Sequence, residues 1–235
     1  MQTFRDAVFA PAPQFTISAL FADAELAVSN VGALMAFVLH DKTEKDARDS
    51  VKLLEKPVSE TSLGESLRCL YAYAFGGIWT PSLHLTEGGY DHLDVLVDMT
   101  GREDMAFQED KAVLIHRLKA IVKARAAIDI AAVPAEITPI FDYPGTDPLG
   151  YEGLALLSNL SIVTLRNRVS SKRFPVKTVK YGREIGFEPK QALDWLVSRG
   201  EFVPTRMLSA NEFTKRETAY TEAWLDGGKK VLGGA

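Results

Sequence analysis

The stretch "LSNLSIVTLRNRVSSKRFPVKTVKYGR" occupies residues 157–183 and carries the strongest signal in the chain. From Ser161 onward it has no acidic residue and seven basic ones: Arg166, Arg168, Lys172, Arg173, Lys177, Lys180 and Arg183. The whole chain of 235 residues has a formal net charge of -4. Positive charge gathered into one segment of an acidic chain indicates that this segment has its own partner.

The residues around this stretch predict two short helices joined by a tight turn. The first helix lies in "DPLGYEGLALLSN", residues 147–159, with three inward side chains: Leu154, Ala155 and Leu157. Ser161 is a good N-cap for a second helix over residues 162–169. In that helix Ile162 and Leu165 pack inward. Its outward side chains are expected to be Arg166, Asn167 and Ser170. Such a pair forms a helix-turn-helix, which lays its second helix in the DNA major groove.

A hairpin and a third helix are predicted next. "VKTVKYGREIGF", residues 176–187, alternates apolar and polar side chains and has "YG" at a turn position, which favours a two-stranded wing. "EPKQALDWLVSRG", residues 188–200, favours a helix that begins at Pro189 and stops at Gly200. Trp195 is expected to anchor the core there.

This order of elements resembles the winged helix-turn-helix of the MerR, excisionase and AlpA-like group. "LSNLSIVTLRN" is similar to the first two helices of that group, in which a small-residue turn precedes "TLR". The resemblance covers residues 151–205 and implies DNA binding. Asn167 and Arg168 stand where MerR proteins often have a Tyr pair, and effector cysteines are absent, which argues against a metal-sensing MerR activator. Residues 1–133 carry no such resemblance.

The basic residues are suited to DNA because Lys and Arg contacts release phosphate counterions. Arg166, Asn167 and Arg168 are expected to reach base edges, where Arg pairs with guanine and Asn with adenine. The remaining basic residues are expected to contact phosphates or the minor groove. The full predicted surface comprises Thr164, Arg166, Asn167, Arg168, Ser170, Lys172, Arg173, Lys177, Lys180 and Arg183. The alternative is the solvated basic face of an ordinary small domain.

Composition predicts a mainly α protein in two unlike parts. Residues 149–235 hold 14 Lys and Arg against 9 Asp and Glu, giving +5; the remainder holds 13 against 22, giving -9. Residues 1–133 are therefore predicted to form an acidic helical domain. Residues 134–149, with four prolines, are predicted to be a linker. Residues 150–235 are predicted to hold the winged helix-turn-helix, with a short hairpin wing and a C-terminal helical extension.

Two apolar segments of the acidic part bear on self-association. Residues 15–39 are apolar on almost every face, so we expect them deep in a core or an interface. Helical spacing also aligns one stripe: Leu114, Leu118, Ile121, Arg125 and Ile128. The stripe is interpreted either as packing within the domain or as a dimer seam.

The sequence offers little for catalysis. No phosphate-binding Gly-Lys loop, Gly-x-Ser-x-Gly turn or Cys/His nucleophile arrangement is present, so we expect neither an enzyme nor a cofactor. His84 and His92 lie near acidic residues, but their spacing matches no usual zinc pattern, and no metal is expected. Residues 76–89 favour a structural loop over a ligand pocket walled by Trp79. Cys69, the single cysteine, fits a buried position and a reducing cytosol.

Together these patterns predict a cytoplasmic, bacterial, sequence-specific DNA-binding protein without a membrane span. A transcriptional regulator is the leading hypothesis. A homodimer formed through the acidic domain is expected because two linked modules gain from effective concentration. Alternatives are a phage- or plasmid-type architectural or recombination accessory protein, and an adaptor whose basic face binds an acidic protein.

Overall fold

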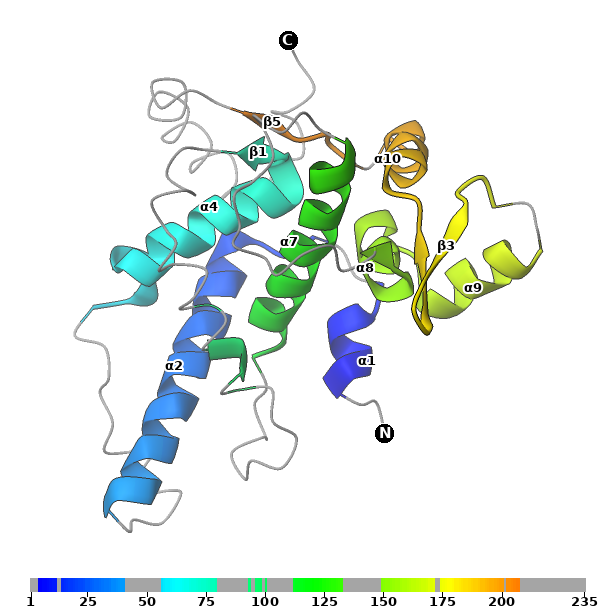
Figure 1. Ribbon diagram of the computed structural model, residues 1–235. Helices are drawn as coiled ribbons and strands as arrows, with labels where there is room; N and C mark the ends of the chain where they lie inside the picture. Colours follow the sequence, from blue (N-terminus) through cyan, green and yellow to red (C-terminus); the bar gives the residue numbers. More distant parts are fainter. Residues whose placement is uncertain are drawn as a thin grey trace.

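A computed structural model of the chain describes residues 4–11, 14–40, 56–79, 93, 96–98, 100, 112–132, 149–171, 174–200 and 202–207. The protein is mainly helical (Figure 1), as predicted. The helices are α1 (Phe4–Phe9), α2 (Ile17–His40), the 3-10 helix η1 (Val58–Glu60), α4 (Ser62–Gly76), α7 (Val113–Ala132), α8 (Tyr151–Ser158), α9 (Ile162–Ser170) and α10 (Pro189–Ser198). The strands are β1 (Ile78–Trp79), β2 (Leu149–Gly150), β3 (Thr178–Tyr181), β4 (Glu184–Phe187) and β5 (Arg206–Met207).

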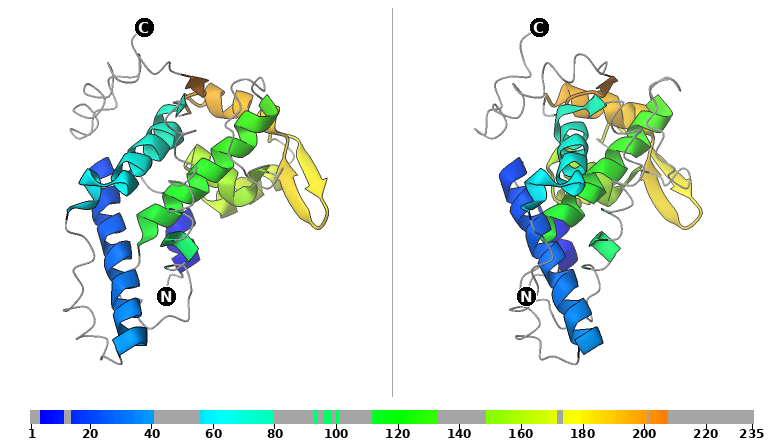
Figure 2. Two further views of the ribbon diagram at one scale, coloured as in Figure 1. Left: turned by 60° about the vertical axis from the view of Figure 1, so that its left-hand side comes forward. Right: turned by 90° about the vertical axis from the view of Figure 1, so that its left-hand side faces the viewer.

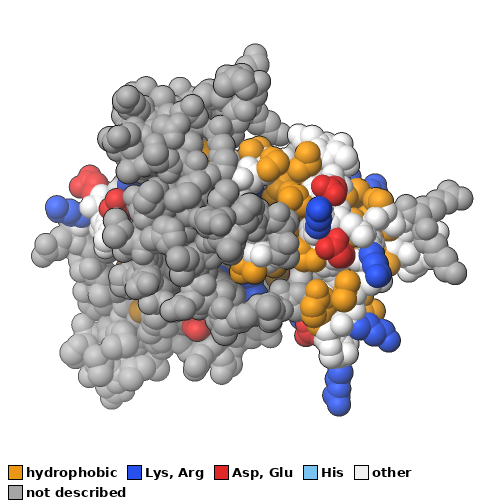
Figure 3. Space-filling view, turned by 45° about the horizontal axis from the view of Figure 1, so that its top comes forward, with side chains coloured by type: hydrophobic (Ala, Val, Ile, Leu, Met, Phe, Trp, Pro, Cys, Tyr) orange, Lys and Arg blue, Asp and Glu red, His pale blue; other side chains and the backbone are white. Residues whose placement is uncertain are grey.

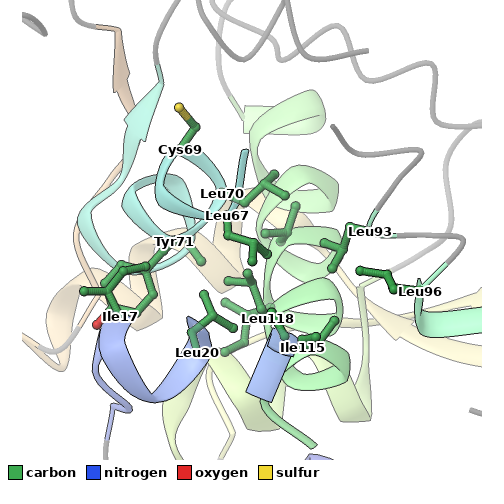
Figure 4. Packing of buried hydrophobic residues seen from close by; sticks show 14 of the residues in the cluster. Ile17, Leu20, Leu67, Cys69, Leu70, Tyr71, Leu93, Leu96, Ile115 and Leu118 are labelled. Atoms are coloured by element: carbon green, nitrogen blue, oxygen red, sulfur yellow. The ribbon is translucent and has the colours of Figure 1, made fainter. Parts of the chain in front are cut away.

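The first hydrophobic core lies between α2, α4 and α7 (Figure 4). Leu20 from α2, Leu67 from α4 and Leu118 from α7 are fully buried in it. Cys69 is buried in the same cluster, as predicted. Leu93 and Leu96 cover the α7 side of this core. Three helices of the acidic half therefore form most of this core, and Leu156 of α8 completes it.

Residues 15–39 were expected deep in a core or an interface, and the described part of α2 contributes one face to the first core. Up to Gly32, α2 buries one stripe, and its apolar members are Ile17, Leu20, Ala24 and Ala27. Their spacing of 3, 4 and 3 is that of an ordinary amphipathic helix. The opposite face is formed by exposed residues, among them Ser18, Ala22, Glu25 and Ser29.

Helix α7, which contains the predicted stripe, packs against helices on two sides. Figure 1 shows it between α2 and α4 on one side and α8 and α10 on the other. Leu118, Ile121, Arg125 and Ile128 are all buried inside the chain. These four residues therefore pack within the chain and are not available as a dimer seam, although Ile128 packs against the C-terminal part and not only within residues 1–133.

The second core lies under α8, α9 and α10 and the small sheet, which together form residues 149–200, here called the C-terminal module. The sheet is antiparallel, in the order β2-β4-β3. Leu154, Leu165 and Phe187 are fully buried in this core. Trp195 packs edge-on against Phe174, with ring centroids 4.9 Å apart. Two views in Figure 2 show the β3–β4 hairpin projecting from the body of the protein.

Packing crosses the boundary that composition suggested between the two parts. Ala124 and Ile128 of α7 belong to the second core, together with residues of the C-terminal module. Leu149, placed in the linker by sequence, is buried and pairs with Phe187 in the sheet. The predicted linker up to residue 148 lies outside the described residues. Charge thus changes along the sequence at a place where the packing is continuous.

Helix α1 contacts α7 near its N-terminal end and also contacts α8, so it links the two cores. Arg5 donates a hydrogen bond to Glu152 of α8 at 2.9 Å from Nε. Buried Arg117 of α7 donates to the Val8 carbonyl at 3.3 Å and to the Ala10 carbonyl at 2.6 Å. These contacts fix the N-terminal segment between α7 and α8.

Two titratable groups near the start of α7, Asp23 of α2 and His116 of α7, have pKa values shifted in opposite directions. The Asp23 carboxylate accepts the amide of Ile115 at 2.8 Å, so it caps α7 from the neighbouring helix. Burial, only partly offset by these backbone hydrogen bonds, raises the pKa of Asp23 to about 6. Burial, reinforced by Lys119 and opposed by Asp98, lowers the pKa of His116 to about 4. His116 Nε2 lies 2.9 Å from the hydroxyl of Thr100.

These pKa values predict opposing effects of acid on folding stability. The unfolded chain protonates His116 near the ordinary histidine pKa of 6.5, above the folded pKa, so acidification between pH 6.5 and 4 favours unfolding. Folded Asp23 takes its proton near pH 6, above the ordinary aspartate pKa of 3.8, so acidification between pH 6 and 3.8 favours folding. We therefore expect Asp23→Asn to steepen the loss of unfolding free energy between pH 6 and 4, and His116→Gln to reduce it. Urea unfolding at several pH values measures both slopes; changes of equal sign in the two variants would contradict the assignment.

In the part of the chain that the structure describes, no helix is both long and apolar enough to span a bilayer. The predicted C-terminal helical extension beyond residue 207 lies outside the described residues.

Candidate nucleic-acid interface

The connection between α8 and α9 is fixed by local hydrogen bonds. Asn159 ends α8 in the left-handed conformation, with φ 49° and ψ 37°. The Leu160 amide donates to the Ala155 carbonyl at 3.0 Å, which closes the end of α8. Ser161 then begins α9, because its hydroxyl accepts the amide of Thr164 at 3.0 Å. The predicted turn and N-cap are confirmed, and they set the direction in which α9 leaves α8.

Helix α9 presents an outer face of mostly polar side chains, none of them acidic. Leu165 is buried, and Ile162 and Val169 pack partly against the second core. Arg166, Asn167, Arg168 and Ser170 are exposed. The outward orientation predicted for this helix is therefore correct.

The two arginines lie on opposite edges of this face and have different surroundings. The guanidinium of Arg166 lies 5.7 Å from the ring centroid of Tyr151, a cation–π distance that holds it toward α8. Arg168 lies in the last turn, where a cation also interacts favourably with the helix dipole. Asn167, four residues after Val163, lies between them on the outermost part of the helix.

Not every predicted residue is placed at this face. Thr164 is half-buried, and its hydroxyl lies 2.7 Å from that of Ser161, so it belongs to the helix cap. Lys172 and Arg173 lie outside the described residues.

The β3–β4 hairpin carries the other predicted basic residues. Tyr181 pairs with Glu184 across a turn of two residues, in which Gly182 has φ +60°. Glycine adopts this angle without steric cost. Lys177, Lys180 and Arg183 are exposed, as predicted. The amide of Lys177 donates to the Gln191 side chain at 2.9 Å, which attaches the base of the hairpin to α10.

Register places Lys180 on a defined face of the hairpin. Lys180 lies opposite Ile185, and Thr178 lies opposite Phe187. Directly paired residues point to the same side of a sheet, and the side alternates from one residue to the next along a strand. These two pairs therefore lie on the same face of the hairpin, the face from which Phe187 enters the core. Glu184 is exposed beside the turn, so the tip of the hairpin carries one acid next to Arg183.

Three exposed apolar side chains of this region were missed by the sequence-based site. Val163 on α9 is 65% exposed, and Ile185 and Tyr181 on the hairpin are 46% and 38% exposed. The spacing of Val163 from Arg166 and Asn167 could have revealed it, because residues three and four apart share a helix face. Figure 3, which views the molecule with its top forward, shows described Lys and Arg side chains interspersed with apolar ones.

A buried polar network, here called the Arg125 network, joins the segment after α10 to α4 and α7. Its members are Tyr73, Arg125, Asp129 and Thr205. The Thr205 hydroxyl accepts from Arg125 Nε at 3.0 Å and donates to Asp129 Oδ2 at 2.6 Å. The Tyr73 hydroxyl also donates to Asp129, at 2.6 Å. The chain beyond α10 is thereby attached to the acidic half, next to the parallel pairing of β1 with β5.

Arg125 makes further contacts that explain its full burial. Nη1 donates to the Ala74 carbonyl at 3.1 Å, and Nη2 donates to the Val203 carbonyl. Its guanidinium lies 4.5 Å from the Phe202 ring centroid and 5.4 Å from that of Tyr73. Burial raises the pKa of Asp129, and this rise is partly offset by Arg125 and by the hydroxyls of Thr205 and Tyr73. This is a structural network, since each polar group points at another part of the chain.

Within the described ranges, no three His, Cys, Asp or Glu side chains come together as a metal site. His84, His92 and most of the predicted loop over residues 76–89 lie outside those ranges. In the comparisons, no family model matches the chain, and no curated protein or solved structure matches it at a significant level.

Proposed function

We propose that this chain binds double-stranded DNA, with α9 in the major groove and the β3–β4 hairpin against the adjacent backbone. The observation that supports it best is the outer face of α9, where exposed Arg166, Asn167 and Arg168 occur without any acidic residue on the helix. Arginine and asparagine are the residues that pair bidentately with guanine and adenine in that groove. The resemblance of residues 151–205 to the winged helix-turn-helix group supports the same assignment.

The hairpin supplies the electrostatic part of the proposal. Lys177, Lys180 and Arg183 are exposed on an element that projects from the body of the protein. Contacts between such basic side chains and DNA phosphates position a protein on the duplex without reading its sequence. We infer that sequence-specific binding by α9 serves transcriptional regulation in a bacterial cytoplasm. A homodimer is part of this proposal, with a seam other than the buried stripe of α7.

A second candidate role is architectural. Ile185 and Tyr181 are exposed near the end of the hairpin, and apolar side chains inserted between base steps kink DNA. A DNA-bending measurement by fluorescence energy transfer between duplex ends separates the roles. Bending that Ile185→Ala abolishes would favour the accessory role, whereas an unbent duplex would favour the regulator.

The main test is the salt dependence of binding to a random-sequence duplex. Each phosphate contact contributes roughly 0.9 to the slope of log affinity against log salt concentration. Lys180→Ala is expected to reduce that slope by about 1 and to weaken all duplexes alike. Lys56→Ala, which removes an exposed lysine from the acidic half, is the matched control and should leave the slope unchanged. A slope near zero for the native protein would refute DNA binding.

The same titrations separate base contacts from phosphate contacts. Asn167→Ala is expected to reduce discrimination between a selected site and random DNA by about 1–3 kcal/mol, because it removes a base contact. Its salt slope should match that of the native protein. If Lys180→Ala alone changed sequence preference, the roles of α9 and the hairpin would be reversed.

A further inference from the structure

Val163 is the most exposed of the large hydrophobic side chains that the structure describes. It is 65% exposed, whereas the others in this class, Ile130, Tyr181, Ile185 and Val197, are 38–46% exposed. A single exposed hydrophobic residue is common on protein surfaces. The position of Val163 distinguishes it, because it lies in the first turn of the helix that would enter the groove.

Val163 shares a face with the polar residues of α9 that the DNA-binding proposal uses. Val163, Asn167 and Ser170 are separated by four and three residues and are all exposed. Arg166 flanks them on the side of Tyr151. The N-terminal residues of a recognition helix are those that contact base edges. The face that would meet the bases is thus polar at its centre and apolar at its N-terminal end.

The chemistry of the groove offers one partner for an apolar side chain. The isopropyl group of valine neither donates nor accepts a hydrogen bond. On the major-groove edges of the bases, the remaining features are hydrogen-bond donors and acceptors, and the thymine 5-methyl group is the apolar one. A valine facing guanine or cytosine there would remove water from polar groups without replacing their hydrogen bonds.

We propose that Val163 contacts the 5-methyl group of a thymine and so selects T·A at one position of the site. This inference rests on the proposed function. Val163 and Asn167 are four residues apart, which is about 6 Å along a helix axis. Base pairs are about 3.4 Å apart. The thymine therefore lies within about two base pairs of the adenine that Asn167 pairs with.

The experiment combines a protein variant with a DNA variant that each remove only methyl groups. A preferred duplex is first selected from random sequence with the full-length native protein. Each thymine is then replaced singly by deoxyuridine, which lacks the 5-methyl group and keeps every hydrogen-bonding atom. One replacement is expected to weaken native binding about fourfold, the loss of one buried methyl-sized contact. Val163→Ala should bind the thymine duplex several-fold more weakly and show no further loss with deoxyuridine at that position.

Controls separate this contact from folding and from DNA binding in general. Val197→Ala removes another exposed valine, 42% exposed on α10, and should keep the full sensitivity to deoxyuridine. The urea midpoint of Val163→Ala should equal that of the native protein. Two outcomes would overturn the role of Val163 and leave DNA binding standing, provided that binding depends on salt. In one, the losses of affinity from Val163→Ala and from deoxyuridine add. In the other, no single replacement of thymine by deoxyuridine weakens binding. Absence of salt-dependent binding in the native protein would overturn both.

Discussion

Replacing Arg125 with methionine is expected to lower the free energy of unfolding by about 3–5 kcal/mol, the cost of breaking a buried charge pair from one side. The variant leaves buried Asp129 without its cationic neighbour. It also leaves the carbonyls of Ala74 and Val203 without the donors that now satisfy them. Urea unfolding followed by circular dichroism measures the change.

Two further variants test whether the cost arises from the Arg125 network. Arg168→Met removes an exposed arginine from another helix and should change stability by less than about 0.5 kcal/mol. The double variant Arg125→Met with Asp129→Leu should recover part of the loss, since it removes both charges and not one. A single-variant cost below about 1 kcal/mol would show that the network does not stabilise the fold.

The second large effect is expected for Gly77→Ala. Gly77 ends α4 with φ +64°, and a Cβ there would lie 2.6 Å from the Pro204 carbonyl oxygen and 2.5 Å from Nη2 of Arg125. The left-handed conformation costs a residue with a Cβ about 1–2 kcal/mol. Forcing apart packed groups costs about 1–3 kcal/mol more. We therefore expect a total loss of about 2–5 kcal/mol in urea unfolding.

Gly200 supplies a control for the conformational part of this cost. It has φ +72°, and nothing lies within 4 Å of a Cβ built there. Gly200→Ala should therefore cost only the about 1–2 kcal/mol of the left-handed conformation. Equal losses of unfolding free energy in the two variants would show that close contacts with the segment around Pro204 add nothing to the cost of a Cβ at Gly77.

The C-terminal module was predictable because its signals are local. Ser161, Gly182 and Pro189 each specify a cap, a turn or a helix start within a few residues, and the structure has these features where they were expected. The assignment of the region as a DNA-binding winged helix-turn-helix stays a prediction. The role proposed for Val163 was not predicted, because the sequence-based site was chosen for charged and polar side chains, whereas apolar groups can also read a base.

Features that depend on distant residues were not predictable from pattern. Arg125 was placed on an apolar stripe, but its partner Thr205 is 80 residues away in sequence. Periodicity gives the face of a helix and not the element that covers it, so it could not choose between packing within the domain and a dimer seam. The predicted boundary near residue 134 followed the prolines of residues 134–149, which report where a helix is blocked and not the position of the cores.

The position of α7 has a consequence for how the protein comes apart. Leu118 belongs to the first core and Ile128, ten residues further along the same helix, belongs to the second. If one core unfolded while the other stayed intact, the part of α7 that packs in the unfolded core would become exposed. We therefore expect the two halves to unfold in one cooperative transition. The free energy that protects the exposed face of α9 against local opening would then come from the acidic half as well as from the C-terminal module.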